Sequence, residues 1–382
     1  MPSIDFVSFL EHRAEGSAVA EHVTEAAVRA VLGTVDEPDI RRPITELGMV
    51  RGVVVAPGQV QVGVALTVPN HPLKERIASA VTDAIRRLGP SRVHVDFTAM
   101  SEEDRGALRM SLQGPAHERG EPFAESRVVA VSSGKGGVGK SSLSANLAVA
   151  LARRGKRVAL IDADVYGFSI PRMIGIDRRP VIIDNMVIPP RVHDVAVISV
   201  ALFASDEQTP IIWRGPMLHK ALQQFISDVY WDSPDEVIID MPPGTGDVAL
   251  TMAQILPLSE VVVVTTPQPA AQKVAQRAAY MARKVNLTVS GVVENMSWFT
   301  GNDGVRYELF GAGGGDLLAQ QLGVPLLGRI PLVPALRAGS DVGRPVVLSD
   351  PDGEAARAIE AVADRLLTAP TRRRRLPLLK VT

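Results

Sequence analysis

The 382-residue sequence contains no cysteine. Disulfides, thiolate metal sites and cysteine nucleophiles are therefore excluded for these residues. The formal net charge is −1, so overall charge indicates neither a nucleic acid nor a membrane as a partner. No apolar run is long enough for a transmembrane helix; the best, residues 261–264, has the length of a buried strand. Acidic residues interrupt the first 21 positions, which therefore lack the apolar core of a signal peptide. We predict a cytoplasmic protein.

What the chain does contain is typical of a globular protein. Hydrophobic residues make up 46% and charged residues 22%, a balance that supports a large core. The length is high for one domain. We therefore place a small α/β domain at 1–99, a polar linker without apolar periodicity at 100–124, a larger domain at 125–369 and a basic tail at 370–382.

Both domains show strand and helix patterns. In the small domain, two strands flank the turn Pro57-Gly58, and a helix at 72–88 precedes a strand at 92–97. In the larger domain, continuous apolar strands alternate with helices such as 140–154 and 270–284. Such alternation predicts an α/β fold with a mainly parallel sheet covered by helices on both faces.

A run of residues in the larger domain has the composition of a phosphate-binding loop. It comprises Gly134, Lys135, Gly136, Gly137, Val138, Gly139, Lys140, Ser141 and Ser142. Glycines let backbone N–H groups surround phosphates, and the helix that follows adds its positive dipole end. Lys140 can bridge the β- and γ-phosphates, and the Ser141 hydroxyl can ligate Mg²⁺. The sequence predicts a P-loop NTPase domain that binds ATP and Mg²⁺, with Lys140 as a catalytic residue.

Carboxylates follow two of the predicted strands. Asp162 and Asp164 end one strand, and Asp240 ends another. Ligands of open α/β sheets bind at the carboxyl ends of strands. We therefore assign Asp162 and Asp240 to the metal shell together with Ser141, and Asp164 to the attacking water. Helix capping or turn formation is the alternative for Asp162 and Asp164.

Two further residues have two interpretations each. Asp247 follows Gly244-Thr245-Gly246, and it either serves a γ-phosphate sensor or caps the next helix. Asn295 closes another strand, where its amide suits an adenine edge or forms a turn. We include Asn295 among the nucleotide-binding residues.

Lys135, directly after the first glycine, resembles the lysine of the deviant P-loop class, to which MinD, ParA and the nitrogenase iron protein belong. In that class the residue reaches the nucleotide of the partner subunit. The resemblance implies a catalytic role for Lys135 and a homodimer that encloses two nucleotides. A solvated loop lysine is the alternative.

Taken together, the motifs resemble the Mrp/ApbC family of iron–sulfur cluster carrier ATPases over about residues 126–367. The shared strings are the P-loop and residues 162–167, 213–217, 240–247, 294–297 and 310–315. Residues 18–98 resemble the small domain that precedes the ATPase in many members and is shared with SufT. The resemblance implies slow ATP hydrolysis, an iron–sulfur cluster as cargo, and assembly or client proteins as partners.

Three places depart from the family pattern. Many members carry Cys-x-x-Cys just after the Asn-Met-Ser string, and paired cysteines from two subunits hold a bridging cluster, whereas 298–304 has no cysteine here. The Gly-Cys-Pro of the small domain is Asn70-His71-Pro72, and we interpret His71 as a solvated loop histidine rather than an iron ligand. Val333 stands where members often have aspartate. Because clusters are normally held by thiolates, either a partner supplies them or the cargo has been lost.

We therefore predict a homodimeric MgATPase that acts in iron–sulfur cluster assembly or delivery. A MinD- or ParA-like positioning protein is the alternative, for which the arginines at 372–375 and the leucines after them are a faint membrane signal, although Pro370 and Pro377 leave little room for a helix. A scaffold with a vestigial ATPase is a third hypothesis.

Overall fold

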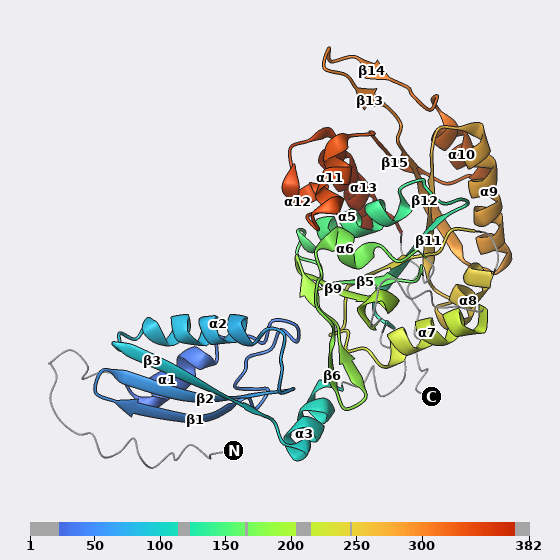
Figure 1. The fold of residues 1–382 in the computed structure, drawn as a ribbon. Coiled ribbons are helices and arrows are strands. Elements are labelled where there is room, and N and C mark those ends of the chain that lie inside the picture. The colour runs from blue at the N-terminus through green and yellow to red at the C-terminus, as the bar shows by residue number, and fades with distance from the viewer. Residues whose placement is uncertain (1–22, 114–122, 165–166, 204–214, 245–246, 371–382) are drawn as a thin grey trace, which may run out of the picture. The chain divides into compact units, whose positions relative to one another are not determined.

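The computed structural model describes residues 23–113, 123–164, 167–203, 215–244 and 247–370 (Figure 1). The chain divides into two compact units, residues 1–110 and 111–382. In the part of the chain that is described, no helix has both the length and the apolar character needed to span a bilayer.

The smaller unit is a three-stranded sheet with two helices packed on it. Its elements are α1 (Glu25–Leu32), β1 (Val50–Ala56), β2 (Gln59–Leu66), α2 (Lys74–Arg86) and β3 (Arg92–Ala99). β1 and β2 are antiparallel, and β2 and β3 are parallel. The apolar sides of α1 and α2 bury Val28, Leu32, Ile77, Val81 and Ile85. The strands and helices predicted for this region are present.

A further helix, α3 (Glu102–Leu112), lies where the sequence indicated a linker. It begins with a capping box: the Ser101 hydroxyl accepts the Asp104 N–H at 3.1 Å, and the Asp104 carboxylate accepts the Ser101 N–H at 3.2 Å. The sequence analysis did not predict this helix, because a short polar helix shows little apolar periodicity.

His71 also differs from the prediction. It lies between β2 and α2 and is buried, with its Nε2 3.7 Å from Oε1 of the buried Glu37. Its Nδ1 accepts the Leu73 N–H at 3.2 Å. The interpretation of His71 as a solvated loop residue is therefore corrected: it belongs to the interior of the small unit.

The larger unit is built on an eight-stranded sheet that is parallel except for one edge strand. Across the sheet the strands are β15 (Leu326–Ile330), β12 (Thr288–Asn295), β11 (Glu260–Thr265), β4 (Arg127–Ser133), β10 (Glu236–Asp240), β5 (Val158–Asp162), β9 (Val195–Ser199) and the antiparallel β8 (Arg191–Val192). The six central strands are almost entirely buried, which explains their continuous apolar sequences.

Helices cover both faces of this sheet, as predicted (Figure 1). One face packs on α5 (Lys140–Ala152), α6 (Ile170–Ile174), α12 (Val346–Ser349) and α13 (Glu354–Thr368), with α11 (Pro334–Asp341) beside them. The other packs on α7 (Gly215–Ser227), α8 (Asp247–Ile255), α9 (Pro269–Lys284) and α10 (Gly314–Leu322). Each face has its own buried apolar cluster.

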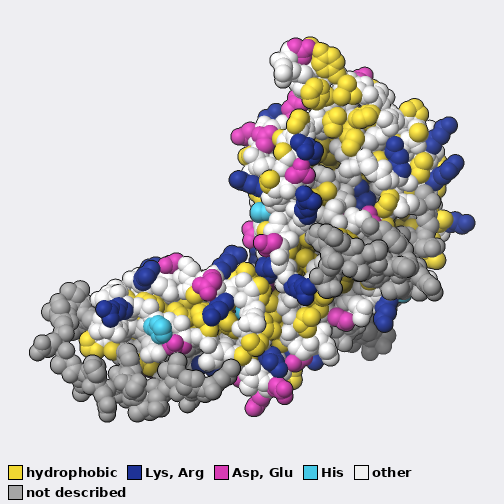
Figure 2. Space-filling view, viewed as in Figure 1, with side chains coloured by type: hydrophobic (Ala, Val, Ile, Leu, Met, Phe, Trp, Pro, Cys, Tyr) yellow, Lys and Arg dark blue, Asp and Glu magenta, His cyan; other side chains and the backbone are white. Residues whose placement is uncertain are grey.

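Two short antiparallel ribbons were not predicted. One is β6 (Val181–Ile183) with β7 (Met186–Ile188), and the other is β13 (Phe299–Thr300) with β14 (Arg306–Tyr307). Figure 2 shows apolar side chains gathered over the β13–β14 ribbon, where Val305, Tyr307 and Leu309 are exposed.

Candidate functional site

The predicted phosphate loop connects the carboxyl end of β4 to the first turn of α5. Gly137 and Gly139 have positive φ values of 78° and 81°, which L residues rarely adopt. No side chain caps the start of α5, and its first turn contains no acidic residue. The first N–H groups of the helix are thus left for an anion, as in phosphate sites at helix N-termini.

Neighbouring elements fix the shape of this loop. A Cβ added to Gly134 would lie 2.2 Å from the backbone carbon of Val274 in α9. A Cβ added to Gly139 would lie 2.1 Å from the Asn295 side-chain nitrogen, at the end of β12. By contrast, an added Cβ on Gly136 or Gly137 would meet nothing within 4 Å. The loop therefore packs tightly against its neighbours at Gly134 and Gly139. The space beside Gly136 and Gly137 is open and leaves room for a phosphate.

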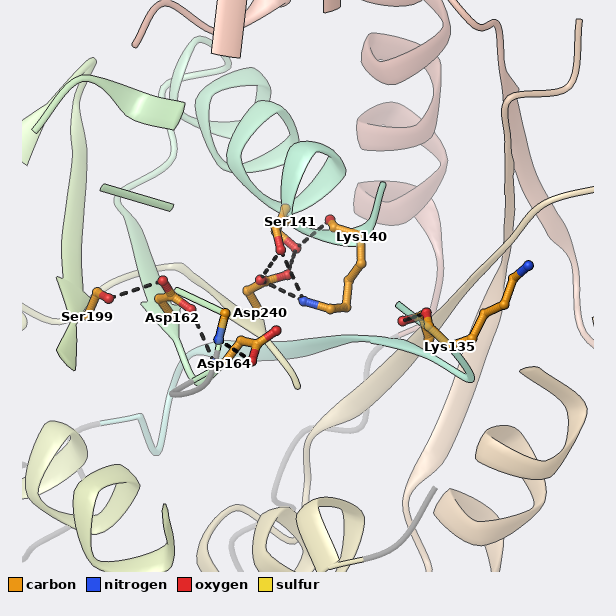
Figure 3. Close-up of polar contacts among 10 residues, drawn as sticks. Lys135, Lys140, Ser141, Asp162, Asp164, Ser199 and Asp240 are labelled. Atoms are coloured by element: carbon orange, nitrogen blue, oxygen red, sulfur yellow. Dashed lines mark hydrogen bonds and ion pairs between the residues drawn. The ribbon is translucent and has the colours of Figure 1, made fainter. Parts of the chain in front are cut away.

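Asp240 is the centre of the polar contacts below the loop (Figure 3). Its Oδ2 lies 2.7 Å from Lys140 Nζ and accepts the Ser141 hydroxyl at 2.6 Å. Its Oδ1 accepts the Ser144 hydroxyl at 2.6 Å. Lys140 and Asp240 are 5% and 0% exposed, so both charges are held away from water. The structure thus brings three predicted site residues together and adds Ser144.

Sequence reasoning missed Ser144, although a signal existed. It lies four residues after Lys140 and three after Ser141, which places all three on one face of the helix. At this spacing the Ser144 hydroxyl reaches the Asp240 carboxylate that Lys140 and Ser141 also contact.

Asp162 lies beside Asp240, because the two residues are register partners in β5 and β10. Its carboxylate accepts the Ser199 hydroxyl at 3.1 Å and the Asp164 N–H at 3.2 Å. Burial, followed by the negative charge of Asp240, raises the pKa of Asp162 to about 7. Two crowded, buried carboxylates next to a serine hydroxyl form an oxygen-rich donor set that a hard dication would neutralise.

This donor set fits Mg²⁺ bound together with phosphate. Among the residues that the structure describes, no group of three or more His, Asp or Glu side chains could hold a metal ion by itself. Mg²⁺ commonly takes one or two carboxylates and fills its shell with phosphate oxygens and water. Ser141, Asp162 and Asp240 match that requirement.

Asp164 lies in the turn after β5. Its carboxylate accepts the Gly167 N–H at 3.1 Å, and the residue is 8% exposed. This contact is the turn formation that the sequence offered as an alternative, while the assignment to an attacking water remains a prediction. Asp247 begins α8, but its side chain and residues 245–246 lie outside the described residues.

Lys135 points away from the Lys140–Asp240 contact (Figure 3). Its Nζ lies 3.4 Å from Oε1 of Gln268, the residue before α9. The side chain does not meet the acidic centre of its own site. This orientation differs sharply from that of Lys140, which turns inward.

Asn295 supports the phosphate loop in this structure. Its side-chain nitrogen donates to the Val138 carbonyl at 2.8 Å, across the gap that Gly139 leaves open. Within the described chain, its buried Oδ1 has no hydrogen-bond partner, and neither has the Ser142 hydroxyl. The predicted adenine contact of Asn295 and the nucleotide contact of Ser142 stay predictions.

The segment without the family's cysteines forms β13 and the turn into β14. Trp298 Nε1 and the Thr300 hydroxyl donate to Oε2 of Glu354 at 3.2 and 2.8 Å, and Arg306 stacks 4.4 Å from the centre of the Trp298 ring. These contacts tie the ribbon to the start of α13. None of its side chains is a thiolate.

Comparisons with known proteins show the family of the chain. Residues 125–367 match the family model of the NUBPL iron-transfer P-loop NTPase, and residues 25–97 match that of the iron–sulfur cluster assembly protein. Iron–sulfur cluster carrier proteins of Mycobacterium tuberculosis and Bacillus subtilis are 49% and 42% identical, over 90% and 81% of this chain and 93% and 88% of theirs. A solved nucleotide-binding protein of Archaeoglobus fulgidus, in complex with ADP, is 30% identical, with a TM-score of 0.55 over 67% of this chain and 98% of its own.

Proposed function

Because the chain belongs to the iron–sulfur cluster carrier family of P-loop NTPases, we propose that it binds and slowly hydrolyses MgATP to drive cluster assembly or delivery. The observation that carries this proposal is the convergence of Lys140 and Ser141 on Asp240, with Asp162 beside it. The Archaeoglobus relative was solved in complex with ADP, which supports nucleotide binding by this chain.

Each residue of the site has a distinct task in this proposal. MgATP supplies the γ-phosphoryl group and a dication that neutralises its charge. Lys140 exchanges Asp240 for a phosphate oxygen, and Ser141 places its hydroxyl oxygen toward the metal. As carboxylates, Asp162 and Asp240 would hold the water shell of the Mg²⁺ ion. Asp164 orients the attacking water at the edge of the site.

We place Lys135 in a homodimer. Its side chain turns away from its own acidic centre toward Gln268 and is partly exposed, which supports contact with a second subunit. In the proposal, MgATP closes two protomers face to face, and the Lys135 ammonium of each contacts the other's phosphates. Hydrolysis reopens the dimer.

The cargo requires a partner. The chain has no cysteine, and iron–sulfur clusters are normally held by cysteine thiolates. We propose that a client or assembly protein supplies the thiolates and that the small unit contacts it. No contact among the described residues favours the MinD- or ParA-like alternative, and its basic segment, 372–375, lies outside them.

The ATPase assignment is tested by steady-state phosphate release with Mg²⁺. Lys140→Ala should reduce turnover at least ~100-fold, because it removes the charge that neutralises the transferred phosphoryl group. Lys284→Ala, an exposed lysine at the far end of α9, should stay within about twofold of wild type. Equal turnover in wild type and Lys140→Ala would reject the site.

Two more variants separate the remaining roles. Asp164→Asn should keep ATP affinity and lose turnover if its carboxylate orients water. Lys135→Ala should keep ATP binding but abolish the ATP-dependent increase in mass seen by light scattering. An ATP-dependent dimer that persists in Lys135→Ala would remove that residue from the interface.

A further inference from the structure

A cavity lies at the amino-terminal end of the large sheet, opposite the phosphate loop. It has a volume of about 1430 Å³ and is lined by the amino-terminal ends of β4, β10 and β11, whereas the P-loop site lies at carboxyl ends. Residues of α7, the end of α8, and Leu367, Ala369 and Pro370 complete its wall. The nucleotide site does not use this cavity.

Unsatisfied polar atoms converge on this cavity. Within the described chain, Arg127 Nε, Glu236 Oε2 and Ser259 Oγ are buried without a hydrogen-bond partner, and all three residues line the wall. Glu236 is 6% exposed, and burial raises its pKa to about 7. A buried polar atom without a partner is costly, so a group of them predicts that something binds there.

The charge of the wall indicates a basic occupant. Four acidic residues line it, Glu125, Asp235, Glu236 and Glu260, against one arginine and one lysine. Asp235 is bonded to Arg157 at 3.1 Å, and Glu260 to Arg127 at 2.7 Å. Glu236 therefore offers the oxygen for a guanidinium or ammonium group from outside the described residues.

The rest of the wall is apolar. Phe123, Ile226, Leu256, Leu258 and Leu367 contribute to it. An occupant should therefore carry a cationic group next to apolar ones. A free inorganic cation would satisfy only the first requirement.

The chain itself continues from this wall with such a sequence. Pro370, the last described residue, lines the cavity, and the next residues are Thr371, four arginines at 372–375, and Leu376, Leu378 and Leu379 around Pro377. A chain extends at most about 3.5 Å per residue, so Arg372 starts within about 7 Å of Pro370. The first arginines can reach the cavity without any rearrangement of the fold.

We propose that this cavity binds residues 371–382 of the same chain, with an arginine from 372–375 paired to Glu236 and the following leucines on the apolar wall. Because the segment is tethered at the rim, its effective concentration is on the order of millimolar or higher, and modest contacts suffice. In this proposal, the arginines that suggested a membrane signal pair instead with Glu236 of the same chain.

Hydrogen–deuterium exchange on the full chain and on a chain that ends at Pro370 tests the proposal. Removal of 371–382 should speed exchange several-fold in residues 254–260, which line the cavity. The full chain with R372E, R373E, R374E and R375E should behave like the shortened one. Charge reversal of the exposed Arg86 and Arg87 on the small unit is the control and should change nothing there. Identical exchange in the full and shortened chains would overturn the proposal.

A labelled peptide with the sequence of residues 371–382 gives an independent measurement. It should bind the shortened chain saturably, and Glu236→Gln should weaken binding about tenfold, as expected for a lost charge-assisted bond. Glu125→Gln, an exposed acid on the same wall, should change it by less than about twofold. Equal affinity for Glu236→Gln, with its fold verified by circular dichroism, would reject the pairing. A small molecule released from the full chain on denaturation would reject the segment as occupant.

Discussion

At the scale of single residues, Asp162 has a structural cost that its proposed metal-binding role would explain. It is 1% exposed and lies beside Asp240, and both features raise the pKa of its carboxyl from 3.8 to about 7. Without a dication, a charged Asp162 opposes folding. If Asp162 holds the metal as proposed, the site gives up stability for affinity, as binding sites often do.

The variant Asp162→Asn should show this cost as a pH dependence. In the wild type, the folded state binds more protons than the unfolded state between pH 4 and 7, so the free energy of unfolding falls as pH rises through that window. This decrease in the free energy of unfolding is complete above pH 7 and amounts to about 4 kcal/mol at most. Nucleotide-free Asp162→Asn should therefore be more stable than wild type at pH 8 and gain little at pH 4.

Urea unfolding at both pH values measures this difference. The exposed Asp352→Asn serves as the control and should shift neither value by more than about 0.5 kcal/mol. The same Asp162→Asn protein should bind MgATP more weakly. A stability gain that is equal at pH 4 and pH 8 would contradict the pKa shift as its cause.

Ser144 is expected to act as a positioning residue. Ser144→Ala leaves the buried Asp240 Oδ1 without the bond that it accepts at 2.6 Å. We expect a loss of about 1–3 kcal/mol in stability and a higher Mg²⁺ concentration for half-maximal ATPase activity. Ser144→Thr keeps the hydroxyl and should recover the Mg²⁺ dependence. An unchanged Mg²⁺ dependence in Ser144→Ala would limit the residue to a structural role.

At the scale of elements, the phosphate loop is held by what surrounds it. Gly134 lies against the backbone of α9, so Gly134→Ala must move either the loop or the helix. We expect a loss of several kcal/mol of stability in the absence of nucleotide, together with weak ATP binding. Thermal unfolding without nucleotide measures the first effect.

Gly136→Ala is the matched control in the same loop. An added Cβ there would meet no atom within 4 Å, and Gly136 does not have a positive φ. The melting temperature of nucleotide-free Gly136→Ala should stay within about 2 °C of wild type. Equal destabilisation by the two substitutions would mean that flexibility, rather than the contact with α9, explains the glycine at 134.

Elements of the larger unit could be predicted where the sequence has a continuous apolar run or a motif that requires a particular element. Strands such as β10 and β11 are buried on both faces and read as continuous apolar runs, and α5 follows a motif that requires a helix. α3, which begins in the smaller unit, was missed because its signal is the Ser101–Asp104 capping box rather than an apolar stripe. The β13–β14 ribbon was missed because two-residue strands carry no period.

The candidate site was predictable to a similar degree. Motif spacing identified Lys140, Ser141 and Asp240, since each has a fixed place relative to β4, α5 and β10. Ser199 could not be found, because its contact with Asp162 depends on β9 pairing with β5. Long-range pairing of this kind has no local signal in the sequence.

At the scale of the whole molecule, the two compact units have separate interiors. Both apolar clusters of the larger unit consist of residues between Phe123 and Leu366. A chain of residues 111–382 should therefore fold alone, bind MgATP with an affinity within about threefold of the full chain, and unfold in one cooperative transition. Calorimetry and ATP titration measure both properties. Aggregation of this chain would show that the small unit is needed for its folding.

The absence of cysteine leads to the last prediction, which concerns the cargo. The purified full chain, incubated anaerobically with iron and sulfide and then desalted, should retain less than one cluster per two chains, because it offers no thiolate. Iron and sulfide analysis with the visible spectrum measures this, and a protein-free sample controls for colloidal iron sulfide. With ATP and a thiolate-bearing client present, the cluster should appear on the client.

A stoichiometric cluster on the chain alone would contradict this expectation and would require ligands other than sulfur from the protein. His71 is the first residue to test in that case. Its Nε2 lies 3.7 Å from Glu37 Oε1 inside the small unit, so His71→Ala should then remove the cluster and leave ATP turnover by the larger unit unchanged. Loss of both together would instead show that the substitution does more than remove a ligand, because His71 and the phosphate loop belong to different compact units.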